Sequence, residues 1–143
     1  MDPAAVLLTD LATLTPLTTR NVEAVVAVSA AAHKLGTAGL LCVRELEWGS
    51  VHDIGPDEWD TVLCSDCLYD ASVFAAFSAT LCDVVGAKGT ALIAYKQRIP
   101  ERETSFLQEL SEVFAIRVHS ANGQTPWNYA QDNVFILELR KRR

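Results

Sequence analysis

The segment WDTVLCSDCLYDA, Trp59–Ala71, joins an apolar run to a turn of short polar side chains. Asp60–Ser65 has the composition of a buried strand, and Ala71–Val85 has the composition of a helix with Asp70 as a suitable N-cap. The segment also contains two chemical signals, a Cys-x-x-Cys pair and an Asp-x-x-Tyr pair. A strand that leads directly into a helix predicts an α/β protein.

The rest of the chain continues this alternation. Further strands are predicted at residues 4–10, 40–49, 89–96, 115–120 and 133–141, and further helices at residues 11–34 and 101–114. Pro16 is tolerated only in the first turn of its helix, and Gly36 is a suitable stop. We therefore expect a single domain over residues 1–143, with a mostly parallel sheet and a C-terminal antiparallel hairpin.

The composition excludes several functions. The chain has 143 residues, 50% of them hydrophobic, and a net charge of −6, which argues against a nucleic-acid partner because such surfaces are basic. No apolar run approaches the ~20 residues of a membrane span, and no signal peptide is recognisable. The four cysteines then indicate free thiols in a reducing compartment. We therefore expect the protein in the cytoplasm or the nucleus.

Cys64 and Cys67 could form a redox pair or half of a zinc site. If the chain were extended between them, their Cα atoms would lie ~10 Å apart on opposite faces, which is too far for a disulfide. A zinc site needs four ligands, but the other candidates (Cys42, Cys82, His33, His52 and His119) occur singly. The pattern favours two small apolar side chains packed under a sheet, and no metal.

The other polar candidates lie where predicted strands end. Asp10 ends the first strand, Trp48 the second, and Ser65, Asp66 and Tyr69 follow the third. Each could be structural if taken singly. Together they predict a ligand site, because parallel α/β sheets bind ligands beyond the carboxyl ends of their strands.

The motifs VLLTDL, LEWG, LCSDCLYD and AYKQR, in this order, resemble the family 16 seven-β-strand protein-lysine methyltransferases, which use S-adenosylmethionine. The resemblance implies that Asp10 binds the ribose of the cofactor, that Trp48 lies beside its adenine and that Ser65 lines its methionine end. It also implies that Asp66 and Tyr69 hold the target lysine. The implied partner is a protein substrate, for which an AAA ATPase chaperone or another chaperone is the expectation.

The chain departs from the family in one respect. The first family strand, which ends in a Gly-rich loop similar to E-x-G-x-G-x-G, has no counterpart in the sequence. Because that strand is central in the family sheet, we expect an incomplete gene model or splice form, a direct re-pairing of the two halves, or a strand supplied by a partner. Without the Gly-rich turn we also expect weak or no binding of S-adenosylmethionine, which calorimetry would test.

Three functions are compatible with these observations. The first is a protein-lysine methyltransferase, inactive if the missing strand is essential. The second is a non-catalytic truncated domain that acts by binding a partner, and the third is a thioredoxin-like oxidoreductase that uses Cys64 and Cys67. Methyl transfer that depends on Asp66 would favour the first.

Overall fold

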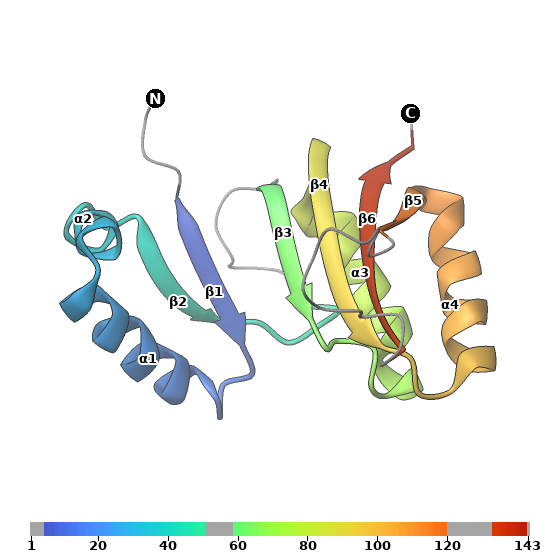
Figure 1. Ribbon diagram of the computed structural model, residues 1–143, viewed down its shortest axis with the longest axis horizontal. Coiled ribbons are helices and arrows are strands. Elements are labelled where there is room, and N and C mark those ends of the chain that lie inside the picture. Colours follow the sequence, from blue (N-terminus) through green and yellow to red (C-terminus); the bar gives the residue numbers. More distant parts are fainter. Residues whose placement is uncertain (1–4, 51–58, 120–132, 143) are drawn as a thin grey trace. The chain divides into compact units, whose positions relative to one another are not determined.

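The structure, a computed structural model, describes residues 5–50, 59–119 and 133–142. The chain forms two compact units, Met1–Gly55 and Pro56–Arg143, whose elements are labelled in Figure 1. Three residues named in the predictions lie outside the described residues: Ala4 and Ser120, at the ends of two predicted strands, and the candidate zinc ligand His52. No helix within the described ranges is long and apolar enough to cross a membrane.

The N-terminal unit contains a pair of parallel strands with two helices between them in sequence. Strand β1 (Val6–Asp10) pairs with β2 (Leu41–Glu45), and the register places Asp10 opposite Glu45. Helices α1 (Thr15–Val28) and α2 (Ala30–Thr37) connect them. The β-α-β arrangement was predicted, and both carboxylates end their strands at the same edge.

The prediction of a single helix over residues 11–34 is wrong, because the structure has two helices, α1 and α2. Ser29 has an extended backbone (φ −116°, ψ 115°) that ends α1, and its hydroxyl accepts the Ala32 N–H and so caps α2. Gly36 lies inside α2 rather than at its end, and the left-handed residue after the helix is Gly39 (φ 69°). Pro16 does lie in the first turn of α1, as expected.

The C-terminal unit is built on a four-stranded sheet with the order β3-β4-β6-β5. Strand β3 (Trp59–Ser65) is parallel to β4 (Val85–Lys96), whereas β6 (Val134–Lys141) is antiparallel to both β4 and β5 (Phe114–His119). The antiparallel β5–β6 pairing confirms the predicted terminal hairpin. The mixed sheet with helices between its strands confirms the predicted α/β fold class.

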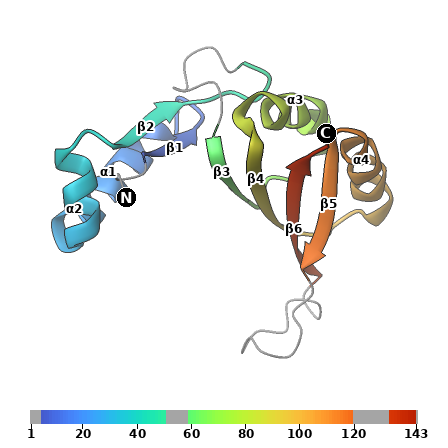
Figure 2. The same ribbon diagram turned by 90° about the horizontal axis from the view of Figure 1, so that it is seen from above.

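The core of this unit lies between the sheet and two helices. Helix α3 (Phe74–Val84) and helix α4 (Pro100–Val113) lie along one face of the sheet (Figure 2). Alternate residues of β4 and β6 point into that layer, so the cross-strand pairs Ala91–Leu139 and Ile93–Leu137 are buried. This period of two is what a sheet covered on one face produces.

Strand β4 is longer than predicted. It begins at Val85, whereas the predicted strand begins at Gly89. The ladder instead shifts register here, with Trp59 opposite Val85 and Thr61 opposite Thr90. A Cβ on Gly89 would lie 2.5 Å from the Trp59 carbonyl oxygen. The glycine is therefore required by a close backbone approach within the irregular part of the sheet.

Strands β1 and β3 are each at the edge of the sheet in their own unit. Among the described residues, β1 pairs only with β2, and β3 pairs only with β4. Each of these two strands has one edge without a partner among them.

Candidate active site

The turn after β3 places two of the predicted site residues at the protein surface. Asp66 has a left-handed backbone (φ 55°), and its N–H continues the ladder by donating to the Ala94 carbonyl at 2.8 Å. Leu68 is 1% exposed and anchors the turn in the core, whereas Tyr69 is 60% exposed. The buried Leu68 between them thus leaves the side chains of both predicted site residues exposed to solvent.

Asp70 closes this turn as predicted. Its carboxylate accepts the Ser72 N–H at 2.9 Å at the start of the short 3-10 helix Ala71–Val73, which leads into α3. This hydrogen bond lowers the pKa of Asp70, with a smaller contribution from the nearby charge of Arg102. The end of the Asp-x-x-Tyr turn is therefore fixed by an N-cap.

Asp66 forms a two-point ion pair with Arg98. The guanidinium Nη1 and Nη2 atoms lie 3.0 and 3.1 Å from the two carboxylate oxygens, and Nη1 also donates to the Lys96 carbonyl. Such fork-to-fork geometry is the strongest form of the arginine–carboxylate contact. The pair raises the pKa of Arg98, chiefly through the hydrogen bond to Asp66.

The backbone of Arg98 is itself held by a buried carboxylate. Glu103 is 2% exposed, and its Oε1 atom accepts the N–H groups of Arg98 and Ile99 at 2.8 and 3.2 Å. These donors lie at the N-terminus of α4, where a negative charge is favourable. A continuous set of contacts therefore runs from α4 through the Arg98 loop to Asp66.

The two cysteines of the Cys-x-x-Cys pair are free, but they are not separated as an extended chain would require. Strand β3 ends at Ser65 and Asp66 turns the chain, so the side chains of Cys64 and Cys67 are hydrogen-bonded. That bond, burial and the charge of Cys67 raise the pKa of Cys64. Cys67 Sγ lies 3.5 Å from the Ser65 carbonyl. A raised pKa disfavours the thiolate that redox chemistry needs.

The residues expected to contact the cofactor belong to both units. Ser65 is exposed at the end of β3, next to Asp66. In the N-terminal unit, Asp10 Oδ1 accepts the Leu11 N–H at 2.8 Å, and the Asp10 carbonyl accepts the Leu46 N–H. Trp48 lies in the turn after β2 that is closed by the bridge between Glu47 and Ser50. A carboxylate with one oxygen so engaged still offers Oδ2 to a ribose hydroxyl, so Asp10 suits the predicted role.

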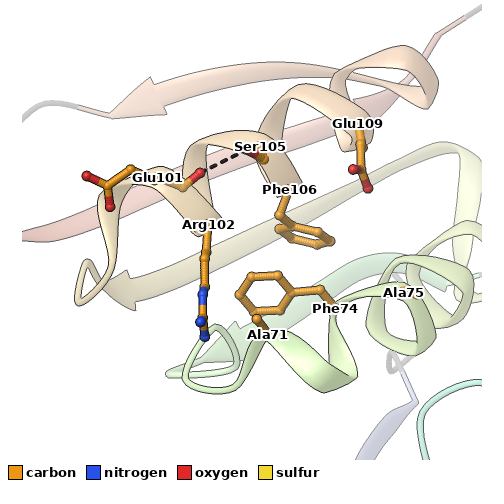
Figure 3. A pocket seen from close by; sticks show the side chains of 8 residues that line it. All are labelled: Ala71, Phe74, Ala75, Glu101, Arg102, Ser105, Phe106 and Glu109. Carbon is orange, nitrogen blue, oxygen red and sulfur yellow. Dashed lines mark hydrogen bonds between the residues drawn. The ribbon is translucent and has the colours of Figure 1, made fainter.

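A groove of about 530 Å³ lies between α3 and α4, and the facing rings of Phe74 and Phe106 form part of its lining (Figure 3). Their ring centroids are 4.6 Å apart, and Glu101, Arg102 and Glu109 also line the groove. None of the predicted site residues lines it. Among the described residues, no three His, Cys, Asp or Glu side chains are grouped to hold a metal ion.

Sequence reasoning assigned no role to Arg98 or Glu103. Arg98 belongs to the AYKQR motif, and it meets Asp66 only because the β3–β4 register places Ser65 opposite Ala94. In the sequence, Glu103 is one of several charged residues of an amphipathic helix. Its position four residues after the helix N-cap Ile99 was the available signal, because a glutamate in the first turn can reach back to the preceding N–H groups.

Comparison with solved structures defines the class of fold. The chain superposes with a TM-score of 0.61 on a putative rRNA-methylase from Clostridium thermocellum, at 12% identity, over 97% of this chain and 73% of that one. It superposes with a TM-score of 0.62 on the N-methyltransferase NodS from Bradyrhizobium japonicum WM9 in complex with S-adenosyl-L-homocysteine. The identity is 10%, over 97% of this chain and 67% of NodS. The O-methyltransferase NcsB1 from neocarzinostatin biosynthesis gives a TM-score of 0.56 at 15% identity, over 96% of this chain and 42% of NcsB1. The fold is thus that of the Rossmann-like methyltransferases.

The family is defined by the sequence itself. The model of the lysine methyltransferase family matches residues 1–113, which is most of the chain, and the protein therefore belongs to this family. This confirms the predicted class of enzyme, an S-adenosylmethionine-dependent methyltransferase.

Proposed function

We propose that this protein transfers a methyl group from S-adenosylmethionine to a lysine side chain of a protein substrate. The match of residues 1–113 to the lysine methyltransferase family supports this most directly. The Asp-x-x-Tyr pair adds support, because Asp66 and Tyr69 are both exposed on an anchored turn beyond the carboxyl end of β3. Ligands of parallel α/β sheets bind at that edge.

In this proposal three residues, each at or just after the end of a strand of its own unit, have separate roles toward the cofactor. The carboxylate of Asp10 would accept hydrogen bonds from the ribose hydroxyls, Trp48 would lie beside the adenine, and Ser65 would line the methionine end. When bound, S-adenosylmethionine supplies a methyl group on a positively charged sulfur. An AAA ATPase chaperone or another chaperone is the proposed protein substrate, in the cytoplasm or the nucleus.

Asp66 and Tyr69 position the amine. Methyl transfer is an in-line displacement, so the amine nitrogen must present its lone pair to the methyl carbon while the carbon–sulfur bond breaks. The carboxylate oxygens of Asp66 and the hydroxyl of Tyr69 orient the N–H bonds away from the line of attack. The substrate ammonium gives up a proton to water before the attack, the product carries the positive charge as a methylammonium, and no covalent enzyme intermediate is needed.

Transfer of tritiated methyl groups to proteins of a cell lysate tests the proposal. S-adenosylmethionine is supplied at saturating concentration, because weak binding is expected without the Gly-rich turn. We then expect label in methyl-lysine after acid hydrolysis, with a loss of at least about 100-fold in Asp66→Asn because the amine is no longer positioned. Tyr69→Phe should lose about tenfold, which corresponds to one hydrogen bond. Asp60→Asn, an exposed aspartate at the other end of β3, is the matched control. Label in RNA or in another amino acid would contradict the proposal.

A further inference from the structure

The ion pair between Asp66 and Arg98 lies at the proposed lysine site, and its inferred role rests on that proposed function. Both residues lie just beyond the carboxyl ends of neighbouring parallel strands, β3 and β4. The carboxylate that is expected to receive a lysine amine is thus already in contact with a permanent positive charge. Any amine that binds there binds to the pair rather than to an isolated aspartate.

The geometry leaves room for a second donor. Each carboxylate oxygen can accept two hydrogen bonds, and the arginine fork uses one position on each. The Asp66 side chain remains 59% exposed and the Arg98 side chain 40% exposed. Arg98 therefore fixes the orientation of the carboxylate while its outer lone pairs stay accessible from solvent.

A carboxylate without a compensating charge would work against the reaction. Only the neutral amine of lysine can attack a methyl group, and a free lysine amine has a pKa of about 10.4. A single negative charge beside the amine favours the protonated form and raises that pKa by about one unit or more. A neighbouring guanidinium offsets this effect, because the pair as a whole carries no net charge.

We infer that Arg98 is a positioning residue: it holds Asp66 in a two-point contact and cancels its charge, so that Asp66 receives the substrate lysine as a neutral amine. The loop of Arg98 is suited to this role because its backbone N–H is fixed by the buried Glu103. The Lys96 carbonyl, which accepts from Nη1, holds the guanidinium from a second side.

Other ionisable groups on the elements around the pair do not substitute for Arg98. Asp70 is engaged with the Ser72 N–H, and Glu103 with the backbone N–H groups at the start of α4. Apart from the thiols of Cys64 and Cys67, the remaining ionisable groups of these segments are Tyr69, Lys96, Glu101 and Arg102. None of these four forms a hydrogen bond or ion pair with Asp66 in the structure. Among the described residues, Arg98 is the cation that contacts Asp66.

The pH dependence of methyl transfer tests the inference in the full chain. In Arg98→Gln we expect the rising limb of the rate against pH to move up by about one unit. The rate near neutral pH should therefore fall about tenfold and recover at higher pH, without a rise in KM. Arg98→Lys keeps the charge but not the fork, so it should keep the wild-type pH profile at a lower kcat. Arg117→Gln, an exposed arginine on β5, controls for loss of a positive charge elsewhere.

Chemical rescue separates this role from a structural one. Added guanidinium ions at millimolar concentration should restore part of the activity of Arg98→Ala and return its pH profile toward that of the wild type. The 15N NMR signal of the Arg98 side chain should be distinct from those of mobile arginines and should lose that character in Asp66→Asn. These results, together with the shifted profile, would support the inference.

Two different failures can be told apart. An active wild-type enzyme whose Arg98→Gln variant loses rate equally at every pH, or whose Arg98 signal is that of a mobile side chain, would overturn the inference alone. A wild-type protein that labels no lysine at any pH would overturn the proposed function, and with it the inference about the amine.

Discussion

Glu103 shows how one buried carboxylate can organise an exposed site. Its Oε1 atom accepts two backbone N–H groups at the start of α4, and Tyr95 is buried close enough that the charge of Glu103 adds to the rise in the pKa of Tyr95 caused by burial. Glu103 Oε2 has no hydrogen-bond partner among the described residues. A buried charge is tolerated here because it serves the unpaired donors of a helix end.

Replacing Glu103 should therefore destabilise the protein. Glu103→Ala leaves two backbone donors without an acceptor, and we expect the free energy of unfolding to fall by about 2 kcal/mol. Glu103→Gln should cost less, because the amide oxygen can accept the same two bonds. Urea unfolding measures both changes, with Glu112→Ala, an exposed position on the same helix, as the control. Equal stability of the two alanine variants would show that these bonds contribute little.

At the scale of single residues, the sequence predicted those roles that depend on near neighbours. Asp70 as a cap follows from its position before a helix, and the structure confirms it. The contact between Asp66 and Arg98 spans 32 positions and depends on strand register, which no local pattern encodes. The roles of Asp10, Trp48, Ser65, Asp66 and Tyr69 in binding remain predictions that rest on the family resemblance.

At the scale of elements, the predictions succeeded where a pattern had one interpretation. The strand–helix alternation and the terminal hairpin were both correct. The prediction failed at Ser29, where an Ala-rich sequence compatible with a continuous helix is interrupted, and at VGAKG, where glycines that favour turns lie inside β4. In both places tertiary or capping interactions override local propensity.

The terminal hairpin carries an ion cluster whose strength should depend on pH. Glu138 on β6 lies 2.8 Å from both His119 Nε2 on β5 and Arg140 Nε. The hydrogen bond with His119, followed by that with Arg140, lowers the pKa of Glu138. Because the folded-state pKa is depressed, the resulting stability is present above the unfolded-state value and is lost as the pH falls through the folded-state value.

Glu138→Gln removes this contribution. We expect the variant to be less stable than the wild type at pH 7, and the difference should persist as the pH falls to the ordinary glutamate pKa. It should disappear only below the lowered pKa, where Glu138 is protonated in both states of the wild type. Thermal unfolding from pH 7 down to pH 3 measures it, with Glu112→Gln as the matched control. If the difference in stability between the wild type and Glu138→Gln stayed constant with pH, the charge of Glu138 would not be its cause.

At the scale of the whole molecule, burial is distributed unevenly between the two units. The buried hydrophobic residues of the described ranges run from Leu68 to Leu139, so they all belong to the C-terminal unit. Helices α1 and α2 contain no buried residue, and Leu14, Leu17, Val25 and Val28 are 44%, 49%, 51% and 86% exposed. Composition averaged over the chain gave no sign of this difference, because both units are rich in apolar residues.

This asymmetry predicts two levels of protection in native-state hydrogen exchange. Strands β4 and β6 are paired along both edges and line the core, so their amides should exchange only when the C-terminal unit unfolds. The amides of β1, β2, α1 and α2 should exchange faster, by a factor on the order of 100 or more, because little apolar surface is buried to oppose their local opening. Mass spectrometry of peptides from both units, quenched over a time course at one pH, measures the two classes. Equal protection of β1 and β4 would mean that the N-terminal unit gains its stability from surfaces other than those buried within it.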